Sequence, residues 1–310
     1  MNVKGESMRL ASIDIGTNST RLMVAEKKEG CLKTLYRGAK ITRLGEGIDA
    51  KGVLSDAAME RTIMALKKYK QMVEDNNAVK MSIVATSAVR DATNSQIFID
   101  RAKKEVDLDV SVLAGKEEAR LSFLGATHCH GDNRPILVVD IGGGSTELIF
   151  GKPGHIEKIF SLDIGSVRLT EMFVKNDPPL INEVESIKEH IYLAGKKIYK
   201  KIGGRKDLLG VGLAGTITTL SAVSQNMEVY DPKKIHGSTL LLSEIERILK
   251  IFLSKNLSER KIIVGLESER ADIIISGTLI LTGIMKGLGL KEMMVSEHDI
   301  LDGLILSIDT

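Results

Sequence analysis

The stretch Leu137-Val-Val-Asp-Ile-Gly-Gly-Gly-Ser-Thr-Glu-Leu148 decides the fold of this chain. Its apolar run, from Ile136 to Val139, predicts a buried strand that ends in Asp140 and turns at once through three glycines. Glycines let the backbone bend tightly, and they let its N–H groups approach a ligand with no Cβ in the way. Converging amides beside Ser and Thr hydroxyls suit a phosphate, and a carboxylate on the same turn suits the cation that accompanies a phosphate.

A second copy of this pattern lies near the N-terminus. Ile13-Asp-Ile-Gly-Thr-Asn-Ser-Thr-Arg-Leu-Met-Val24 aligns without gaps on Val139-Asp-Ile-Gly-Gly-Gly-Ser-Thr-Glu-Leu-Ile-Phe150, with an offset of 126 residues and six of twelve positions identical. Two ordinary β-hairpins are the alternative, but a tight hairpin does not need the same Asp-x-Gly-x-x-Ser-Thr pattern twice. The repeat therefore predicts two related halves, each offering a phosphate-binding hairpin to one cleft.

Length and composition limit the class of protein. A chain of 310 residues usually forms two domains, and 43 basic against 41 acidic side chains create no global field that selects nucleic acid or a membrane, so neither is expected as a partner. Cys31 and Cys129 are the only cysteines, which argues against a disulfide framework and favours a reducing, cytoplasmic location. Residues 1–9 carry no apolar signal core, and the uncharged run 273–285 is too short to span a bilayer, so it predicts a core helix.

The remaining chain alternates predicted strands and helices. Met59, Ile63, Leu66 and Val73 form the expected inner face of a helix that Ser55 caps. Asn182, with Glu185 three residues later, predicts a capping box at the start of a long basic helix. The other predicted strands cover 31–41, 81–86, 110–113, 156–162, 208–213 and 293–296. The other predicted helices cover 94–106, 114–128, 271–287 and 298–308, and Ser243 is expected to cap one more.

Two positions outside the twin turns suit an anion. Arg90 follows a predicted strand, where open α/β sheets place their ligands, although a solvated loop residue explains it equally well. Gly215 and Thr216 begin a predicted helix, whose N-terminus can hold an anion through its amides and dipole. The same Gly-Thr turn also suits a plain strand-to-helix connection.

Two further features favour a structural interpretation when taken alone. Glu117 and Glu118 lie in the first turn of a predicted helix, where acidic residues are favoured for electrostatic reasons. His128 and His130 could suggest a metal pair, but residues two apart on a helix do not share a face, so a structural or surface role is expected.

Six motifs occur in a fixed order along the chain. They are Asp14-Ile-Gly-Thr-Asn-Ser19, Thr86-Ser-Ala-Val-Arg90, Gly115-Lys-Glu-Glu-Ala-Arg120, Asp140-Ile-Gly-Gly-Gly-Ser-Thr-Glu147, Gly212-Leu-Ala-Gly-Thr216 and Ser268-Glu-Arg270. With this order over residues 10–305, the chain resembles the exopolyphosphatase and guanosine pentaphosphate phosphohydrolase family (Ppx/GppA). The resemblance implies an α/β fold with two ribonuclease-H-like lobes, as in actin, Hsp70 and sugar kinases, around a phosphate-binding cleft. Residues 1–120 plus the C-terminal helix 298–310 are the expected first lobe, and 121–297 the second.

The resemblance also implies roles for individual residues. The catalytic carboxylate of the family is the second Glu of the Gly-x-Glu-Glu-Ala motif, which is Glu118 here and replaces the structural interpretation. By the same matching, Asp140 and Glu147 hold a divalent cation, with Asp14 close by. The implied phosphate-binding residues are Gly16, Thr17, Asn18, Ser19, Arg90, Gly142, Gly143, Gly144, Ser145, Thr146, Gly215, Thr216 and Arg270.

The implied reaction is the in-line attack of water on a terminal phosphoryl group, with Mg²⁺ or another divalent cation and Glu118 as general base. The implied substrates are inorganic polyphosphate and guanosine penta- or tetraphosphate, between which the sequence does not choose. A phosphotransferase of the sugar- or acetate-kinase kind and a non-catalytic nucleotide or alarmone sensor are the alternatives. Long family members carry a further helical C-terminal region; this sequence ends at Thr310, so less processive action on long chains is expected, and a homodimer is left open.

Overall fold

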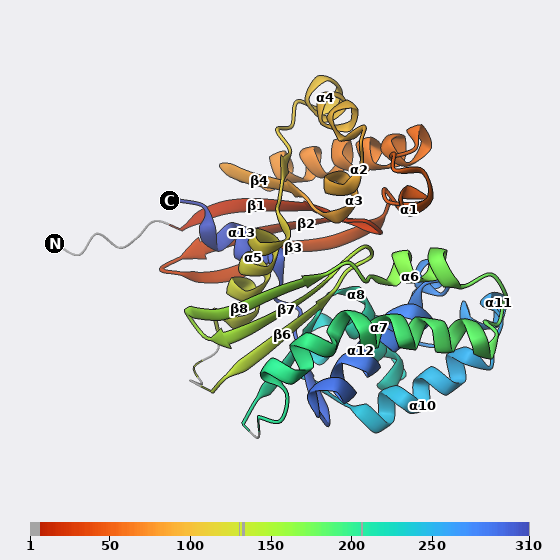
Figure 1. Ribbon diagram of the computed structural model, residues 1–310. Helices are drawn as coiled ribbons and strands as arrows, with labels where there is room; N and C mark the ends of the chain where they lie inside the picture. The colour runs from red at the N-terminus through yellow and green to blue at the C-terminus, as the bar shows by residue number, and fades with distance from the viewer. Residues whose placement is uncertain (1–6, 130, 132–133, 206, 310) are drawn as a thin grey trace. The chain divides into compact units, whose positions relative to one another are not determined.

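The computed structural model describes residues 7–129, 131, 134–205 and 207–309 (Figure 1). The chain divides into two compact units, which are described separately below. Unit 1 comprises Met1–Gly125 and Asp299–Thr310, and unit 2 comprises Ala126–His298. Each unit is built on one β-sheet with helices packed against it. Among the described residues, no helix is both long enough and apolar enough to cross a membrane.

The sheet of unit 1 has five strands in the order β3-β2-β1-β4-β5. Strands β1 (Met8–Ile15), β2 (Ser19–Lys28) and β3 (Cys31–Ile41) form an antiparallel meander. Strands β4 (Lys80–Ala85) and β5 (Ser111–Val112) continue the sheet parallel to β1. Parallel strands need crossover connections, and here these contain α1 (Ile48–Lys51) and α2 (Asp56–Asp75), and then α3 (Ser87–Asp91) and α4 (Ser95–Val106).

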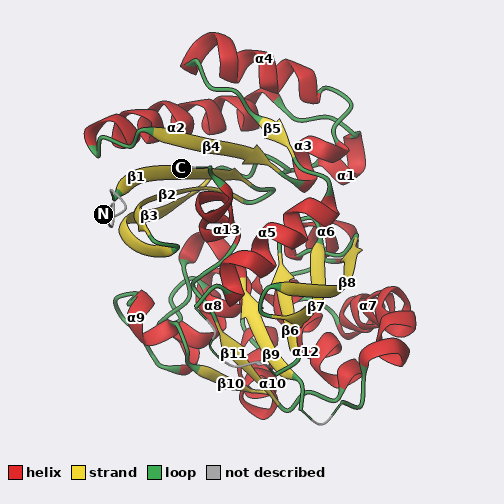
Figure 2. Cartoon of the chain, turned by 90° about the vertical axis from the view of Figure 1, so that its left-hand side faces the viewer, coloured by secondary structure: helices red, strands yellow, loops and turns green. Residues whose placement is uncertain are grey.

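Alternating residues of β1 and β2 supply two apolar layers, one on each face of this sheet. On one face, Ile13 and Leu22 pack with α2, whose predicted inner face (Met59, Ile63, Leu66 and Val73) is buried, as expected. On the other face, Leu10 and Met23 pack with Leu301 and Ile305 of α13 (Ile300–Ser307). Figure 2 shows α2 and α13 on opposite sides of these strands.

Helix α5 (Gly115–Thr127) also belongs to unit 1 over most of its length, because it packs closely on α13. A Cβ on Gly125 would collide with the carbonyl oxygen of Asp299, and a Cβ on Gly303 would collide with that of Leu121. Only glycine allows the two backbones to approach so closely. Unit 1 therefore extends to Gly125, beyond the expected limit at residue 120.

Unit 2 repeats the same plan with six strands in the order β10-β11-β9-β6-β7-β8. Strands β6 (Ile136–Ile141), β7 (Thr146–Lys152) and β8 (His155–Leu162) form the meander, and β9 (Leu209–Leu213) and β11 (Glu292–Val295) run parallel to β6. The short β10 (Thr239–Leu241) pairs antiparallel with β11. An antiparallel meander followed by parallel strands is the ribonuclease-H-like arrangement, so the expected fold class is confirmed for each unit.

The helices of unit 2 lie between and after these strands. They are α6 (Ser166–Phe173), α7 (Ile181–Ile202), α8 (Ala214–Ser224), α9 (Pro232–Ile235), α10 (Leu242–Leu253), α11 (Leu257–Arg260), the 3₁₀ turn η1 (Ser268–Arg270) and α12 (Ile274–Leu288). Helix α12 contains most of the uncharged run 273–285 and is buried over nearly all its length, so the predicted core helix is confirmed.

The expected starts of three of these helices are wrong by one to three residues. Helix α7 begins at Ile181, with Leu180 as N-cap, and the Glu183 carboxylate accepts the Leu180 N–H at 2.8 Å. Glu183 also accepts the Lys175 N–H at 2.9 Å, so the loop before the helix selects this glutamate rather than Glu185. Helix α10 begins at Leu242 with Leu241, rather than Ser243, as its N-cap. The 3₁₀ turn η1 precedes the start of α12 at Ile274.

Candidate active site

The twin turns predicted from the repeat close in the same way. In the first turn, the Gly16 N–H donates to the Ser19 carbonyl at 3.0 Å, and in the second the Gly142 N–H donates to the Ser145 carbonyl at 3.0 Å. A Cβ on either glycine would lie 3.1 Å from the same serine oxygen, which is tighter than ordinary contact. The shared glycine is therefore explained by the backbone closure of each turn.

The carbonyl groups of the first turn are engaged by the loop that follows β3. Thr17 O accepts the Gly45 N–H at 2.9 Å, and Asn18 O accepts the N–H groups of Thr42 and Arg43 at 3.1 and 2.9 Å. The Asn18 side chain is only 7% exposed, and its Nδ2 has no hydrogen-bond partner within the described chain. A buried donor left without a partner costs about 1–3 kcal/mol, so a ligand oxygen at this position would relieve that cost.

The carbonyl groups of the second turn are engaged by the N-terminus of α6. Gly143 O accepts the N–H groups of Val167 and Arg168 at 2.9 and 3.1 Å, and Gly144 O accepts Arg168 Nε–H at 2.7 Å. By contrast, the N–H groups of Gly143 and Gly144 donate to no oxygen of the described residues. Helix α6 thus fixes the turn through the carbonyl groups of the turn, and the N–H groups of Gly143 and Gly144 remain available to an anion.

Thr146 is an exception among the predicted phosphate ligands. Its hydroxyl donates to Ile164 O at 2.6 Å, and the residue is fully buried. A hydroxyl has a single proton to donate, so this one is used within the fold. The Thr146 hydroxyl proton therefore supports the fold and is not available to a phosphate.

The carboxylate of the first turn belongs to a buried ion-pair network. Asp14 lies opposite Arg21 in the β1–β2 pairing, and its Oδ2 accepts Arg21 Nε and Nη2 at 3.0 and 2.6 Å. Arg21 also pairs with Asp299, and Arg37 pairs with Asp299 at 2.5 Å and with Asp302 at 2.8 Å. Arg21, Arg37, Asp299 and Asp302 are residues that the sequence analysis missed.

Burial and charge act against each other in this network. Burial raises the pKa of Asp14 above its ordinary value, and Arg21 acts in the opposite direction. Burial also acts to raise the pKa of Asp299, but the charges of Arg21 and Arg37 outweigh it and hold that pKa below its ordinary value. The second carboxylate oxygen of Asp14, Oδ1, is buried and has no partner in the described residues, as suits an oxygen that accepts from a ligand or supports a cation.

The second turn places two acids where the first places an acid and an arginine. Asp140 lies opposite Glu147 in the β6–β7 pairing, at 9% and 1% exposure. The Ser161 hydroxyl donates to Glu147 Oε1 at 2.8 Å and so orients this carboxylate. Like charges directly opposite each other destabilise a sheet, and carboxylate oxygens are the ligands that Mg²⁺ prefers. The donor chemistry of the pair therefore fits a divalent cation.

The adjacent glutamates of α5 have different surroundings. Arg90 Nη1 donates to Glu118 Oε2 at 3.1 Å and to Leu113 O at 2.8 Å, and the Glu118 side chain is 13% exposed. Glu117 is 44% exposed and pairs with Arg120 at 2.7 Å on the surface, and the hydrogen bonds from Arg120 lower its pKa. The structure thus brings Arg90 and Glu118 together and separates both from Glu117.

The Gly-Thr turn lies beside the end of the second hairpin. Leu213, the last residue of β9, is the register partner of Asp140, and Ala214 follows it with a φ of 66°. A left-handed alanine is unusual, and such strain often accompanies functional turns. The guanidinium of Arg270 lies against Gly215, where any Cβ would collide with it. Arg270 is held there by Glu267 at 2.5 Å.

The predicted site residues thus form two groups, one in each unit. Unit 1 contains Asp14, Gly16, Thr17, Asn18, Ser19, Arg90 and Glu118; unit 2 contains Asp140, Gly142, Gly143, Gly144, Ser145, Thr146, Glu147, Gly215, Thr216 and Arg270. The ion-pair partners and Arg168 were missed because no local pattern marks them. One signal was present in the repeat alignment, which sets Arg21 in the position of Glu147.

The expectation for the histidine pair assumed that the helix includes residue 128. Helix α5 ends at Thr127, so His128 lies in the turn after it and the helical argument does not apply. His130 lies outside the described residues.

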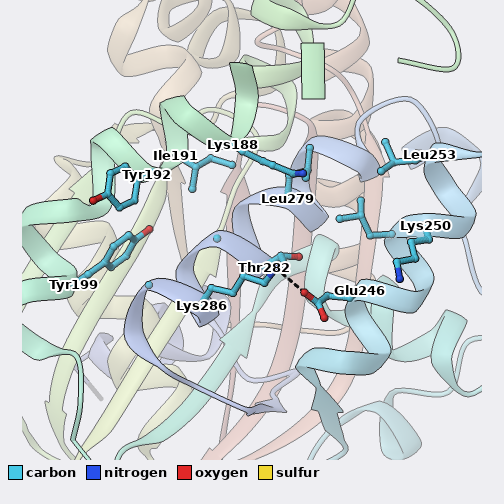
Figure 3. Close-up of a pocket in the computed structure, with 13 residues that line it drawn as sticks. Lys188, Ile191, Tyr192, Tyr199, Glu246, Lys250, Leu253, Leu279, Thr282 and Lys286 are labelled. Atoms are coloured by element: carbon cyan, nitrogen blue, oxygen red, sulfur yellow. Dashed lines mark ion pairs between the residues drawn. The ribbon is translucent and has the colours of Figure 1, made fainter. Parts of the chain in front are cut away.

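A separate pocket of about 590 Å³ lies between α7, α10 and α12 of unit 2 (Figure 3). Apolar side chains such as Ile191, Leu249 and Leu279 line it, and Lys286 pairs with Glu246 at 2.6 Å. None of the predicted site residues lines this pocket. Its largely apolar walls do not suit a chain of phosphates.

Comparison with known proteins assigns the family. The Ppx/GppA phosphatase family model matches residues 23–309, so the chain belongs to this family and the resemblance seen in the sequence is confirmed. The crystal structure of the Aquifex aeolicus family member is similar, with 36% identity, a TM-score of 0.81 and 97% of each chain covered.

Curated relatives differ in length and in name. The chain is 40% identical to a bifunctional 3-dehydroquinate synthase/phosphatase of Fusobacterium nucleatum, and the match covers 96% of this chain but 46% of that protein. It is 35% identical to exopolyphosphatase 2 of Mycobacterium tuberculosis, with 97% and 98% covered. It is 29% identical to a guanosine-5'-triphosphate,3'-diphosphate pyrophosphatase of Photobacterium profundum, with 95% and 58% covered. The chain therefore spans about half the length of two of these relatives.

Proposed function

We propose that this chain hydrolyses the terminal phosphoanhydride bond of inorganic polyphosphate or of a guanosine penta- or tetraphosphate. The observation that carries the proposal is the duplicated Asp-x-Gly turn, closed in both copies by the same hydrogen bond at 3.0 Å. Membership of the Ppx/GppA phosphatase family supports the reaction class. The names of the relatives from M. tuberculosis and P. profundum support the two substrates.

Phosphate binding is assigned to groups that are oriented before substrate arrives. In unit 2 these are the N–H groups of Gly143 and Gly144 and the guanidinium of Arg270 against Gly215. In unit 1 they are the buried Nδ2 of Asn18 and the guanidinium of Arg90. Charged donors form stronger hydrogen bonds to phosphate than neutral ones, so the arginines are expected to contribute most of the affinity.

Asp140 and Glu147 are the residues that would hold a divalent cation, with Asp14 assigned a supporting role. Their oxygens suit Mg²⁺, and Ser161 keeps the Glu147 carboxylate oriented. When bound, such a cation offsets the negative charge of the phosphoryl group that is transferred.

Glu118 is assigned as the general base that orients the attacking water and accepts its proton. Its bond to Arg90, which Leu113 O also fixes, holds the carboxylate in one position. Correct positioning of water supplies much of the catalysis in phosphoryl transfer, where the protein does little covalent work.

The direct test is Glu118→Gln, which keeps the shape of the side chain but removes the base. We expect phosphate release to fall by about 10²–10⁴-fold, the usual contribution of a general base, while substrate binding persists. Glu117→Gln is the matched control, since Glu117 is the adjacent, surface-exposed residue, and its turnover should be nearly unchanged. Equal turnover of the Glu118 variant and the parent would exclude Glu118 as the base.

The substrate is tested by comparing phosphate release from long polyphosphate, short polyphosphate and guanosine pentaphosphate, with and without Mg²⁺, and with no phosphate acceptor other than water. Release without an acceptor distinguishes a hydrolase from a phosphotransferase. Tight binding of the guanosine nucleotide with no release would instead identify a sensor.

A further inference from the structure

Unit 2 brings together two histidines and a cysteine that take no part in the proposed reaction. His128 and Cys129 follow α5, and His298 follows β11, about 170 residues later in the chain. One ligand atom from each, an imidazole nitrogen or the sulfur, lies within 4.8 Å of the other two. From the geometry we infer a binding site for a transition-metal ion of the zinc type at these three residues.

The chemistry of the three side chains selects the class of ion. Two imidazoles and a thiolate suit borderline and soft cations such as Zn²⁺, whereas Mg²⁺ prefers oxygen. With Zn–N bonds near 2.1 Å and Zn–S bonds near 2.3 Å, ligands of one tetrahedral ion lie about 3.5 Å apart. Side-chain rotations that move the ligand atoms by about 1 Å would bring them to this spacing. Cys129 is exposed, so the protein interior does not enclose its side chain.

The position of His298 is fixed by its neighbours. The hydroxyl of Ser296, which is 1% exposed, accepts the His298 N–H at 3.0 Å and donates to His298 O at 3.0 Å. The His298 ring lies between two others, with centroids 5.0 Å from His128 and 4.4 Å from His236. A ligand held in this way loses less freedom when an ion binds.

His236 is excluded as a fourth ligand by its own hydrogen bond. Its Nδ1 accepts the Glu297 N–H at 3.3 Å, so the proton of the neutral ring must sit on Nε2. A protonated nitrogen has no lone pair for a metal. His236 therefore packs against the ring of His298. Among the residues that the structure describes, the site has three protein ligands, which leaves one tetrahedral position for water.

The proposed soft-ion site is distinct from the oxygen-rich pair of Asp140 and Glu147 and does not depend on the proposed hydrolysis. Its ligands adjoin the two places where the chain passes between the units, after Gly125 and after His298. A bound ion would therefore tie the two connecting segments to each other.

The test titrates the metal-stripped full chain with Co²⁺, which reports on its ligands by absorption. We expect a single equivalent to give the visible bands of a tetrahedral ion and a near-ultraviolet thiolate charge-transfer band, both removed by Zn²⁺ and retained in excess Mg²⁺. Cys129→Ser should abolish the thiolate band and weaken Co²⁺ binding by more than the ~10–100-fold that loss of a supporting group costs. His298→Gln should weaken binding comparably.

The chain provides matched controls for both variants. Cys31, the other exposed cysteine, lies in β3 of unit 1, and Cys31→Ser should leave the Co²⁺ spectrum unchanged. His155 is an exposed histidine of β8, and His155→Gln, the control for His298→Gln, should also leave the Co²⁺ spectrum unchanged. If a variant fails to fold, the site is tested by alkylation of the cysteines in the parent protein. Zn²⁺ should protect Cys129, but not Cys31, from alkylation. Absence of a thiolate band in the parent, its persistence in Cys129→Ser, or equal alkylation of both cysteines with Zn²⁺ present would overturn the site.

Discussion

The two Asp-x-Gly turns have the same backbone closure and different electrostatics. Both are closed by a glycine N–H to a serine carbonyl at 3.0 Å, and both follow a strand that ends in Asp-Ile. Across the hairpin, however, Asp14 faces Arg21, whereas Asp140 faces Glu147. One difference at an aligned position turns a charge-balanced pair into a pair of acids.

The comparison separates the backbone closure of the turn from the charge of the residue on the opposite strand. At the shared position, backbone closure favours glycine in both copies, because a Cβ would lie 3.1 Å from the carbonyl oxygen that closes the turn. The cross-strand position is free to vary, because either side chain can be accommodated at the end of the strand. The first turn is therefore expected to depend on its ion pairs for stability, and the second to depend on its acids for cation binding.

The largest expected effect is on the stability of the first turn. Arg21→Gln removes one positively charged partner from Asp14 and one from Asp299. Both carboxylates are less than a tenth exposed. Breaking a buried pair by removal of one partner costs about 3–5 kcal/mol, measured here as the free energy of unfolding in urea. Glu46→Gln removes the charge of an exposed pair with Arg61, whose bonds to backbone carbonyls remain, and should cost at most about 1 kcal/mol. Equal losses in the two variants would contradict the buried network.

The next effect concerns catalysis at the second turn. Glu147→Gln should reduce Mg²⁺-dependent phosphate release by about 10²–10³-fold, since the charge stabilisation supplied by a metal is worth several kcal/mol. The Mg²⁺ concentration for half-maximal turnover should rise as well. Glu157→Gln, an exposed glutamate on the adjacent strand β8, is the control and should behave as the parent. An unchanged Mg²⁺ dependence in the Glu147 variant would remove the proposed difference between the turns.

A smaller effect distinguishes how the two turns are supported. A Cβ on Gly165 would collide with the backbone of Gly143 and Gly144, which α6 holds in place. Gly165→Ala should therefore cost about 1–3 kcal/mol of unfolding free energy and raise the substrate KM. In the first turn, a Cβ on Gly45 meets mainly the side chains of Thr17 and Ala88, so Gly45→Ala should cost less. Comparison of the two variants by urea unfolding checks this order, and the reverse order would contradict it.

The smallest effect is a pH dependence confined to unit 1. Because the pKa of Asp299 is held below its ordinary value, its stabilising contribution is present above the unfolded pKa of about 3.9 and is lost as pH falls through the folded pKa. The difference in unfolding free energy between the parent and Asp299→Asn should shrink below about pH 4, by at most about 1.4 kcal/mol per pH unit. The raised pKa of Asp14 changes the stability of the parent with pH in the opposite direction. The measurement is therefore the difference between the two proteins, not the pH dependence of the parent alone. A difference that stays constant between about pH 5 and pH 3 would refute the role of Asp299.

Much of the fold was predictable from sequence because its signals are local. The twin turns, the inner face of α2 and the apolar helix α12 all follow from glycine requirements and from periodicity over a few residues. The family resemblance, confirmed by the match over residues 23–309, then supplied Glu118 as a candidate where helix statistics alone favoured a structural role. Helix starts were less accurate, since a loop contact rather than the nearest polar residue selected Glu183 as the cap of α7.

Which charged side chains form ion pairs with one another depends on the tertiary structure. Arg21 and Asp299 are 278 residues apart, and no spacing rule connects them, although the fold packs α13 on β1 and β2. The same holds for Cys129 and His298, whose ligand atoms come within 4.8 Å of each other in unit 2 although they are far apart in the sequence. The two turns follow from the sequence alone, because the hydrogen bond that closes each turn joins residues close together in the chain. Their electrostatic surroundings depend on distant residues, which meet only when the sheets are complete.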